Sequence, residues 1–347
     1  MPPKRKITST TKHNDASDTE SVSQSQPPAK RAKPTETPTD QAKAPNGQPT
    51  NKVLPVHITF PPRAAGTLRF AAWNVCGLAA AQRKGFKYYV EAEDPDILVL
   101  TETKVNNEPV DPILSARFPY RTWAISGKKT YSGTAVLSKV KPISVTKLLP
   151  GHPDPDQIKG RLITLEFEGC YVVCTYVTNA GQNLKTLKEK NMWNEHFTTF
   201  IRDLDKKKPV IWMGDMNVAP TATDLANPST NWNKTPGYTL DETEAFRNIL
   251  DAPESPEGTP KFIDIWRARH PDDRHYTYFS YRFNCRMKGI GWRLDMFVLS
   301  ERMVDKVKMC EIRNEIYGAS DHLPVVMEIE SGQVTGTETP AGSLDSV

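Results

Sequence analysis

Residues 210–217 read Val-Ile-Trp-Met-Gly-Asp-Met-Asn, an apolar run that ends in an acid and an amide. Three other apolar runs have a polar group at one end: residues 70–73 before Asn74, 97–101 before Glu102, and 323–327 after His322. Strands that end together at one edge of a sheet would gather these groups into one site. Because no Ser or Cys nucleophile stands beside a base, the set favours a metal-assisted hydrolase acting on phosphate.

Short apolar runs broken by Gly, Pro and Asn extend over residues 66–331 and predict one catalytic domain, because no Pro/Ser-rich linker divides them. Strands are expected at 68–74, 96–101, 120–126, 133–138, 161–168, 171–177, 209–213, 293–299 and 323–329. Apolar residues at helical spacing predict a helix over 184–206. Many strands linked by both short loops and helices predict two packed β-sheets flanked by helices. Residues 251–260 are expected to form a surface insertion.

The two ends of the chain differ in composition from the domain. Residues 1–60 are expected to be a disordered basic tail, because residues 1–50 have no aromatic side chain and are dense in Ser, Thr, Pro, Gln and Lys. Basic clusters at 2–6 and 28–34 favour binding of nuclear import receptors, and hence a nuclear protein. A merely solubilising tail, or a loose grip on nucleic acid, is the alternative. Residues 332–347 are expected to be a flexible C-terminal tail.

Composition excludes some classes of protein. No apolar run approaches the roughly 18 residues of a membrane helix and no secretory signal opens the chain, so no membrane partner is expected. The five cysteines lack zinc-site spacing and are expected to be free thiols in a reducing compartment. A net charge of +4 is compatible with a polyanionic partner but is too small to prove one.

The strongest local signal is Asp215 and Asn217, two positions apart after a buried strand. The Asp could accept a proton from water while the Asn amide orients it or donates to a phosphate oxygen. An ordinary Asx turn explains the same residues equally well. Glu102 could hold Mg²⁺, which prefers carboxylate oxygen and water, although a lone Glu there is usually a solvated loop residue.

His322 is a candidate for neutralising charge on a phosphoryl oxygen, and Asp295 is a candidate acceptor that would orient it. A structural His is the alternative. Tyr176 and Asn179 follow one strand and could donate to phosphate, although a strand-end Tyr is also a common core residue. Aromatic and basic side chains interleave at Tyr276, Tyr278, Phe279, Tyr281, Arg282, Phe283, Arg286, Lys288, Trp292 and Arg293. That stretch suits nucleic-acid stacking, or else a half-buried sheet edge.

Together these residues resemble the exonuclease III family of apurinic/apyrimidinic (AP) endonucleases, in the endonuclease/exonuclease/phosphatase superfamily. The matching stretches occur in family order across 66–331: Trp73-Asn74-Val75, Glu102-Thr103-Lys104, Tyr131-Ser132-Gly133, Asn179-Ala180-Gly181, Gly214-Asp215-Met216-Asn217-Val218-Ala219, Gly291-Trp292-Arg293-Leu294-Asp295 and Ser320-Asp321-His322. The resemblance implies a four-layer, DNase I-like α/β sandwich. It also implies base-excision repair by hydrolysis of the phosphodiester 5′ to an abasic site in double-stranded DNA, with 3′-phosphodiesterase and 3′–5′ exonuclease as further activities.

The resemblance also assigns roles. It implies Mg²⁺, with Mn²⁺ as a substitute, at Glu102 with Asp321 nearby, and water activation by Asp215 with Asn217 beside it. Asn74, Tyr176 and Asn179 would contact the phosphate, and His322, held by Asp295, would stabilise the transition state. Tyr278, Trp292 and Leu294 would wall the pocket for the flipped-out sugar, with Arg282 at its rim. A monomer is expected.

Five departures from the family pattern are Cys76, Thr101, Thr178, Gln182 and Arg282, the last at a position often filled by Met. Cys76 stands where an Asp or Asn is usual, and a thiol is a poor ligand for a hard cation. Altered metal affinity is therefore expected. One alternative is a catalytically weakened protein that binds abasic DNA or acts as a scaffold. Another is a different phosphatase or phosphodiesterase of the superfamily.

Overall fold

A computed structural model describes residues 42–251, 258 and 260–336. The two basic clusters, most of the expected insertion at 251–260, and residues 337–347 lie outside this part of the chain. Contacts divide the chain after Asp40, and the second unit contains every described residue. No helix in the described ranges is both long and apolar enough to cross a membrane.

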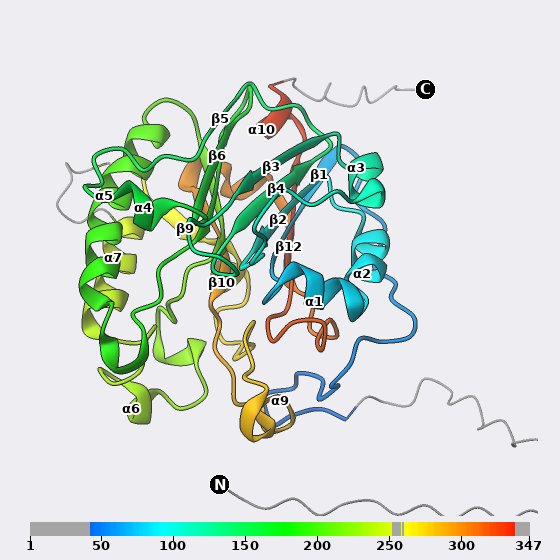
Figure 1. The fold of residues 1–347 in the computed structure, drawn as a ribbon, viewed down its shortest axis with the longest axis vertical. Helices are drawn as coiled ribbons and strands as arrows, with labels where there is room; N and C mark the ends of the chain where they lie inside the picture. Colours follow the sequence, from blue (N-terminus) through cyan, green and yellow to red (C-terminus); the bar gives the residue numbers. More distant parts are fainter. Residues whose placement is uncertain (1–41, 252–257, 259, 337–347) are drawn as a thin grey trace, which may run out of the picture. The chain divides into compact units, whose positions relative to one another are not determined.

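Two six-stranded mixed sheets form the centre of the domain (Figure 1). The first has the order β11-β12-β1-β2-β4-β3, with bounds Val307–Ile312, Val325–Glu330, Thr67–Asn74, Ile97–Thr101, Thr134–Ser138 and Tyr120–Ala124. The second has the order β5-β6-β7-β8-β10-β9, with bounds Ser144–Thr146, Leu162–Glu166, Tyr171–Tyr176, Val210–Asp215, Asp295–Ser300 and Phe262–Asp264.

Helices cover the outer face of each sheet. Those beside the first sheet are α1 Leu78–Arg83, α2 Phe86–Glu93 and α3 Pro112–Arg117, and those beside the second are α5 Leu187–Asp205 and α7 Leu240–Asp251. Shorter helices are α4 Pro155–Ile158, α6 Pro228–Asn231, α8 Ile265–Arg269, α9 Cys285–Lys288 and α10 Gly332–Thr335. The predicted four-layer α/β sandwich is confirmed.

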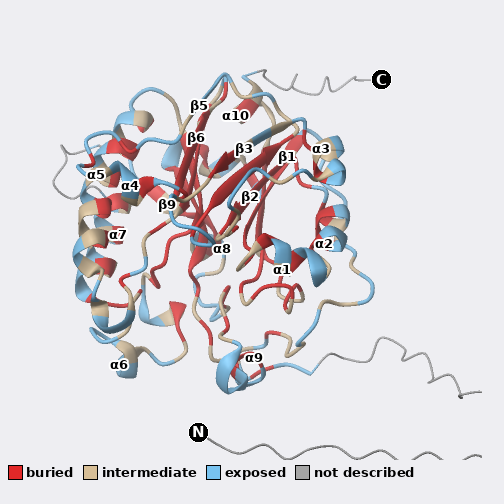
Figure 2. Cartoon of the chain, in the orientation of Figure 1, coloured by how far each residue is buried: buried red, intermediate tan, exposed pale blue. Residues whose placement is uncertain are grey.

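Side-chain alternation explains the layers. In β1, Phe70 and Ala72 enter the core between the two sheets, whereas Ala71 and Trp73 enter the core beneath α1 and α2. The strands are therefore buried on both faces, as Figure 2 shows for the centre of the domain. This double burial is why the sequence shows continuous apolar runs instead of alternating polar and apolar residues.

All nine expected strands and the long helix are present, with ends shifted by one to three residues. Three strands were missed, namely β5, β9 and β11. Two of them have only three residues, and β11 has exposed or half-buried polar side chains at Lys308 and Glu311, so neither length nor apolar content distinguished them.

The expectation of disorder up to residue 60 is wrong for residues 42–60. Gln48 is fully buried there, and Leu54, Ile58 and Phe60 pack against the core beneath α1 and α2. Hydrogen bonds and apolar contact with the domain offset the cost of ordering this segment. The C-terminal expectation also fails for residues 332–336, because Val334 in α10 is buried.

Strand direction places the site. β1 runs parallel to β2, and β7 runs parallel to β8, so these four strands finish at one end of their sheets. β12 and β10 run antiparallel to them and begin at that end. The polar residues after the first set and before the second set therefore meet.

Candidate active site

Asp215 ends β8 and lies at the centre of the site. Gly214, before it, has φ 128°, and a Cβ there would lie 2.2 Å from the carbonyl oxygen of Thr175, so only glycine allows β7 to approach this closely. The carboxylate accepts a hydrogen bond from Asn74 Nδ2 at 2.9 Å and one from the backbone N–H of Asn217 at 2.9 Å. Both oxygens are thus held in a fixed direction.

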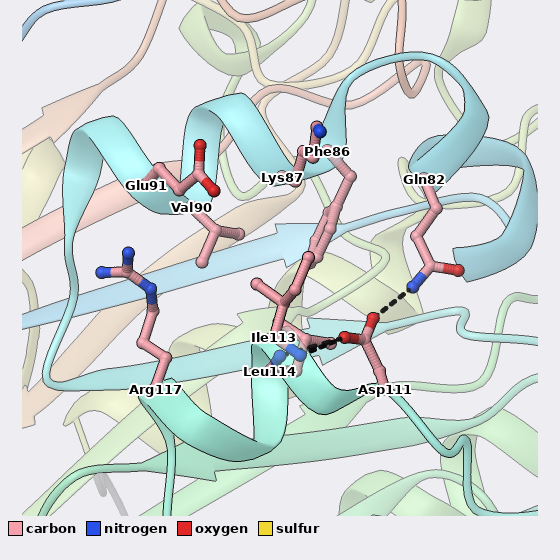
Figure 3. A pocket seen from close by; sticks show the side chains of 9 residues that line it. All are labelled: Gln82, Phe86, Lys87, Val90, Glu91, Asp111, Ile113, Leu114 and Arg117. Carbon is pink, nitrogen blue, oxygen red and sulfur yellow. Dashed lines mark hydrogen bonds between the residues drawn. The ribbon is translucent and has the colours of Figure 1, made fainter.

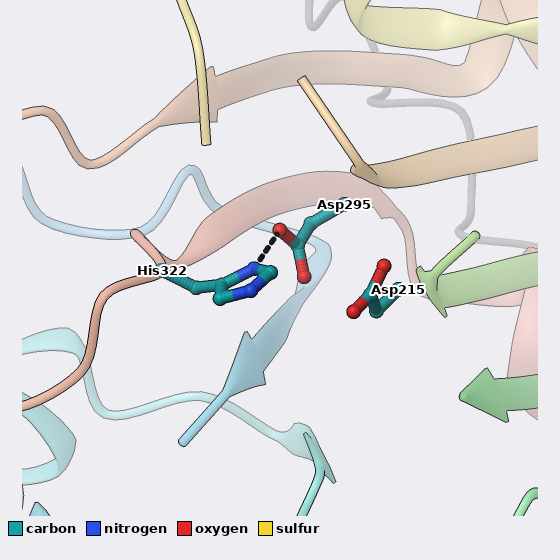
Figure 4. Close-up of side chains that lie close together, drawn as sticks. All are labelled: Asp215, Asp295 and His322. Atoms are coloured by element: carbon teal, nitrogen blue, oxygen red, sulfur yellow. Dashed lines mark hydrogen bonds and ion pairs between the residues drawn. The ribbon is translucent and has the colours of Figure 1, made fainter. Parts of the chain in front are cut away.

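Asp295, the first residue of β10, and His322, in the segment before β12, both face Asp215 (Figure 4). His322 Nδ1 lies 2.8 Å from Asp295 Oδ2, and one ligand atom from each of the three residues falls within 4.8 Å of the others. The backbone is also fixed, because the indole of Trp73 donates to the His322 carbonyl at 3.0 Å. The sequence-predicted pairing of His322 with Asp295 is therefore present.

The electrostatics give Asp215 and His322 opposite tasks. Burial, and then the charge of Asp295, raise the pKa of Asp215 to about 7. Burial disfavours the imidazolium of His322, but the charge and hydrogen bond of Asp295 outweigh it and raise the pKa of His322 to about 10. At neutral pH the site therefore has a carboxylate near its pKa, suited to accept a proton, beside a protonated imidazole.

Asn217 is held by its side chain as well as its backbone. Its Nδ2 donates to the Val177 carbonyl at 2.8 Å, and its Oδ1 accepts from Asn179 Nδ2 at 2.9 Å. Its carbonyl accepts from Lys190 Nζ at 2.6 Å. The Asx turn considered from the sequence exists, since the Asn217 N–H bonds the Asp215 carboxylate, and this turn itself builds the site. Lys190 was not singled out, because in sequence it reads as an ordinary helix residue.

Tyr176 ends β7, and Arg161 links its ring to Tyr131. The sequence did not reveal these contacts. The Arg161 guanidinium lies 5.1 Å from the Tyr176 ring centre, and its Nη2 bonds the Tyr131 hydroxyl at 2.9 Å. Burial, together with Glu102 and Asp215, raises the pKa of Tyr176 well above its usual value, so the hydroxyl stays a donor. No feature of the sequence distinguished Arg161 from other arginine and lysine residues near the starts of strands.

Glu102 and Asp321 flank Cys76. Lys104 Nζ lies 3.3 Å from Glu102 Oε1 and 3.7 Å from Cys76 Sγ. Burial, followed by the charges of Asp321 and Glu102, raises the pKa of the Cys76 thiol to about 12. Cys76 is therefore an uncharged thiol between two carboxylates.

The charge balance of the site suits a metal ion. Four carboxylates, at Glu102, Asp215, Asp295 and Asp321, converge on one imidazolium and the Lys104 ammonium. No described residue makes a hydrogen bond to the buried Asp295 Oδ1. Hard divalent cations take carboxylate oxygens as ligands and would offset this excess negative charge. The buried acidic group can therefore bind a metal here, with His322 as a further ligand only in its neutral form.

The expected pocket wall is partly assembled. Tyr278 forms isolated bridges to both Trp292 and His322, and its ring centre lies 4.9 Å from that of His322. Leu294 is buried next to them, and its carbonyl accepts from the Met216 N–H at 2.8 Å. Arg282 is exposed in the 3₁₀ turn Arg282–Asn284 and is not joined to this group by any described contact.

The interleaved aromatic and basic stretch does not act as one surface. Arg293 is buried and bonds Asp224 and Asp264, each at 2.7 Å, and Arg286 is buried with a bond to Asn51. Nucleic-acid contact is therefore the wrong interpretation for these two arginines, which are internal ion-pair or hydrogen-bond groups. Tyr281, Arg282 and Phe283 remain exposed.

Two hollows differ in character. A wide one of about 770 Å³ is lined by Lys128, Lys159 and Arg161 but also by Asp156 and Glu189, and Lys159 pairs with Asp156 at 2.6 Å, so both signs of charge face it. A smaller one of about 150 Å³ lies between α2 and α3, where apolar side chains such as Phe86 and Leu114 line it (Figure 3). This smaller hollow contains none of the predicted site residues.

A buried acid–imidazole centre at one end of a two-sheet sandwich defines a hydrolase of phosphate esters. The Endonuclease/Exonuclease/phosphatase family model matches residues 71–322. The chain is 39% identical over 264 residues to an exodeoxyribonuclease of Bacillus subtilis, which covers 76% of the chain and 99% of that protein. It is 36% identical over 266 residues to a DNA-(apurinic or apyrimidinic site) endonuclease of Dictyostelium discoideum, which covers 76% of the chain and 71% of that protein.

A solved structure of the 3′ phosphatase NExo from Neisseria, bound to a product DNA hairpin, aligns with a TM-score of 0.66 and 27% identity. The alignment covers 76% of this chain and 99% of that one. The chain belongs to the endonuclease/exonuclease/phosphatase family, as its motifs predicted.

Proposed function

We propose that the protein is a DNA-repair AP endonuclease that hydrolyses the phosphodiester on the 5′ side of an abasic site. The observation that carries this proposal is the pairing of Asp215, with a pKa near 7, and the protonated His322 across one small polar centre. The named relatives support DNA as the substrate and abasic sites as the lesion.

Each group has a task in an in-line displacement. Asp215 accepts a proton from the attacking water, while Asn74 and the Asn217 N–H fix the carboxylate. The water oxygen bonds to phosphorus and the P–O3′ bond breaks; the departing O3′ oxyanion takes a proton from solvent, which leaves a 3′-hydroxyl and a 5′-deoxyribose phosphate. The imidazolium of His322 and the hydroxyl of Tyr176 donate to the phosphoryl oxygens as charge grows on them.

We propose Mg²⁺ as the cation, with Mn²⁺ as a substitute. Glu102 and Asp321 would hold it, and it would supply Lewis-acid stabilisation of phosphoryl charge. The uncharged Cys76 thiol contributes no carboxylate oxygen, so the affinity for Mg²⁺ rests on fewer hard ligands.

The test is incision of a duplex with one tetrahydrofuran abasic analogue, compared with the same duplex having an intact base. Cleavage only 5′ to the analogue, dependent on Mg²⁺ and leaving a 3′-hydroxyl, is the expected result. Binding without turnover over a Mg²⁺ and Mn²⁺ titration would instead favour a scaffold protein. Faster turnover of an inositol phosphate or sphingomyelin would favour another branch of the superfamily. Release of 3′-phosphoglycolate or of terminal nucleotides measures the further 3′-phosphodiesterase and exonuclease activities.

The basic clusters support a nuclear location through import receptors. Replacing Lys4, Arg5 and Lys6 together with Lys30 and Arg31 by alanine in a fluorescent fusion is expected to move signal from the nucleus to the cytoplasm. An unchanged nuclear signal would contradict the assignment. We also propose a monomer, for which light scattering should return the chain mass of 38.9 kDa.

A further inference from the structure

Residues 43–53 form a strap that lies outside the segment matched by the family model. The strap is closed by a bridge between Lys43 and Pro49 and by a hydrogen bond from the Ala44 N–H to the Gln48 carbonyl at 2.8 Å. Gln48, at its centre, has no exposed surface. A fully buried glutamine needs partners for two donors and an acceptor, so its contacts show what the strap holds.

The Gln48 amide pairs with the backbone of Tyr276 in both directions. Its Nε2 donates to the Tyr276 carbonyl at 2.9 Å, and its Oε1 accepts from the Tyr276 N–H at 2.9 Å. The second Nε2 hydrogen goes to Asn314 Oδ1 at 2.6 Å, and Oε1 also accepts from Asn46 Nδ2 at 2.8 Å. The Gln48 side chain thus makes the two backbone hydrogen bonds to Tyr276 that a neighbouring strand would make.

Tyr276 is directly followed by the residues that support the catalytic group. Thr277 Oγ1 accepts from the backbone N–H groups of Leu294 and Asp295 at 2.9 and 3.1 Å. The Thr277 carbonyl accepts from the Leu323 N–H at 2.7 Å. The next residue, Tyr278, lies against His322. A shift of the Tyr276 backbone would therefore move the supports of both Asp295 and His322.

The strap also lies close to the C-terminal end of residues 276–289, the segment that begins with Tyr276, and to the loop before His322. At Gly289, which ends α9 with φ 65°, an added Cβ would lie 3.0 Å from Asn46 Oδ1. At Gly318, an added Cβ would lie 2.6 Å from the Lys52 carbonyl oxygen. The strap is therefore in contact with both ends of residues 276–289 and with the loop that leads to Asp321 and His322.

We infer that the strap is a working part of the active centre, with Gln48 as a positioning residue for the pocket wall and for the Asp295–His322 pair. This inference rests on the proposed function. Pre-organised catalytic groups depend on the residues that hold them, and loss of such support typically costs about 10- to 100-fold in activity. Binding to a duplex with an intact base does not use the pocket wall and depends mainly on phosphate contacts, so it is expected to be unaffected.

Gln48→Met tests the inference, because methionine keeps the length of the side chain and removes its hydrogen bonds. The matched control is Gln333→Ala on α10, which follows the opposite end of β12 from His322. Single-turnover incision of the abasic duplex with saturating enzyme gives a rate constant that does not depend on the folded fraction. A drop of about 10-fold or more with an unchanged Kd for the intact-base duplex is expected for Gln48→Met, and no change for the control.

Gln48→Glu provides a second readout. A protonated carboxyl can accept from the Tyr276 N–H and replace one of the two hydrogens that the amide donates, whereas a carboxylate would face two acceptor oxygens with no hydrogen to donate. Its rate constant relative to wild type should therefore rise as pH falls. Equal rate constants for wild type and Gln48→Met, or a Gln48→Glu ratio that does not vary with pH, would overturn the strap inference. Failure of the wild-type protein to incise would instead contradict the proposed function.

Discussion

The amide of Asn74 donates to the carboxylate of Asp215 over 2.9 Å, and the two residues end central strands of different sheets. The position of the proton acceptor therefore depends on the packing of the whole sandwich. The side-chain Oδ1 of Asn74 also accepts from the Cys76 N–H at 3.0 Å, which fixes the amide orientation. This cross-sheet bond lowers the pKa of Asp215 and so opposes the larger raising effects of burial and of the Asp295 charge.

Asn74→Ala is expected to move the pH dependence of incision. The wild-type rate should rise as Asp215 loses its proton, with a pKa of about 7. Because the Asn74 hydrogen bond favours the ionised form, its removal raises this pKa, and the rising limb moves to higher pH. The plateau rate should fall by about 10- to 100-fold. A pH series of single-turnover rates measures both, and a limb that stays in place would contradict the role of Asn74.

Asp295→Asn is expected to shift the falling, alkaline limb of the pH dependence of incision. Asp295 raises the pKa of His322 to about 10, so the imidazolium is present below that pH and lost above it. Without the carboxylate the pKa falls, and the decline in rate at alkaline pH begins nearer to neutrality. The maximal rate should drop by about 10²- to 10⁴-fold, as for other supports of a catalytic imidazole. NMR titration of His322 would check the pKa independently.

Cys76→Asp is expected to strengthen metal binding. An added carboxylate beside Glu102 and Asp321 supplies a hard ligand in place of a neutral thiol. The Mg²⁺ concentration for half-maximal rate should fall by about 10-fold, and calorimetry of Mg²⁺ binding should show the same trend. Cys76→Ser is the matched control, because it changes the atom without adding charge. Equal Mg²⁺ affinity in all three proteins would place the metal away from residue 76.

Arg293→Ala is expected to destabilise the fold. Arg293 is buried between Asp224 and Asp264, so its removal takes away the guanidinium bonded to Asp264 and leaves Asp224 with Arg267 as its remaining cation. The free energy of unfolding should fall by about 3–5 kcal/mol, measured by urea denaturation. Arg269→Ala, which removes an exposed side chain with one bond to the Lys308 carbonyl, should change it by less than about 0.5 kcal/mol. Similar losses in both variants would contradict the buried ion-pair role.

Much of the fold could be predicted because strands that are buried on both faces have long apolar runs in their sequence. The polar groups at the ends of those runs likewise indicated Asp215, Asn217, Asp295 and His322. Support from distant segments could not be predicted. Gln48, Arg161 and Lys190 meet the site only through packing, and each is an ordinary polar residue in its local sequence.

The arginines of the interleaved aromatic and basic stretch also show what the sequence alone could not predict. Arg282 and Arg293 look alike in sequence, yet one is exposed and the other is fully paired inside the domain. Ion pairs formed in the tertiary structure decide this difference. Asp224 and Asp264, the two partners of Arg293, lie 69 and 29 positions away from it in the sequence.

The most direct test of the proposed activity compares wild type with Asp215→Asn on an abasic-analogue duplex in Mg²⁺. The exchange keeps the size of the side chain and removes the proton acceptor. Single-turnover incision should fall by at least about 10³-fold, while the Kd for the duplex stays within about threefold, because phosphate contacts dominate binding. The variant should be no less stable at pH 8, since it removes a buried charge. Incision by purified Asp215→Asn at a rate close to that of wild type would contradict the account.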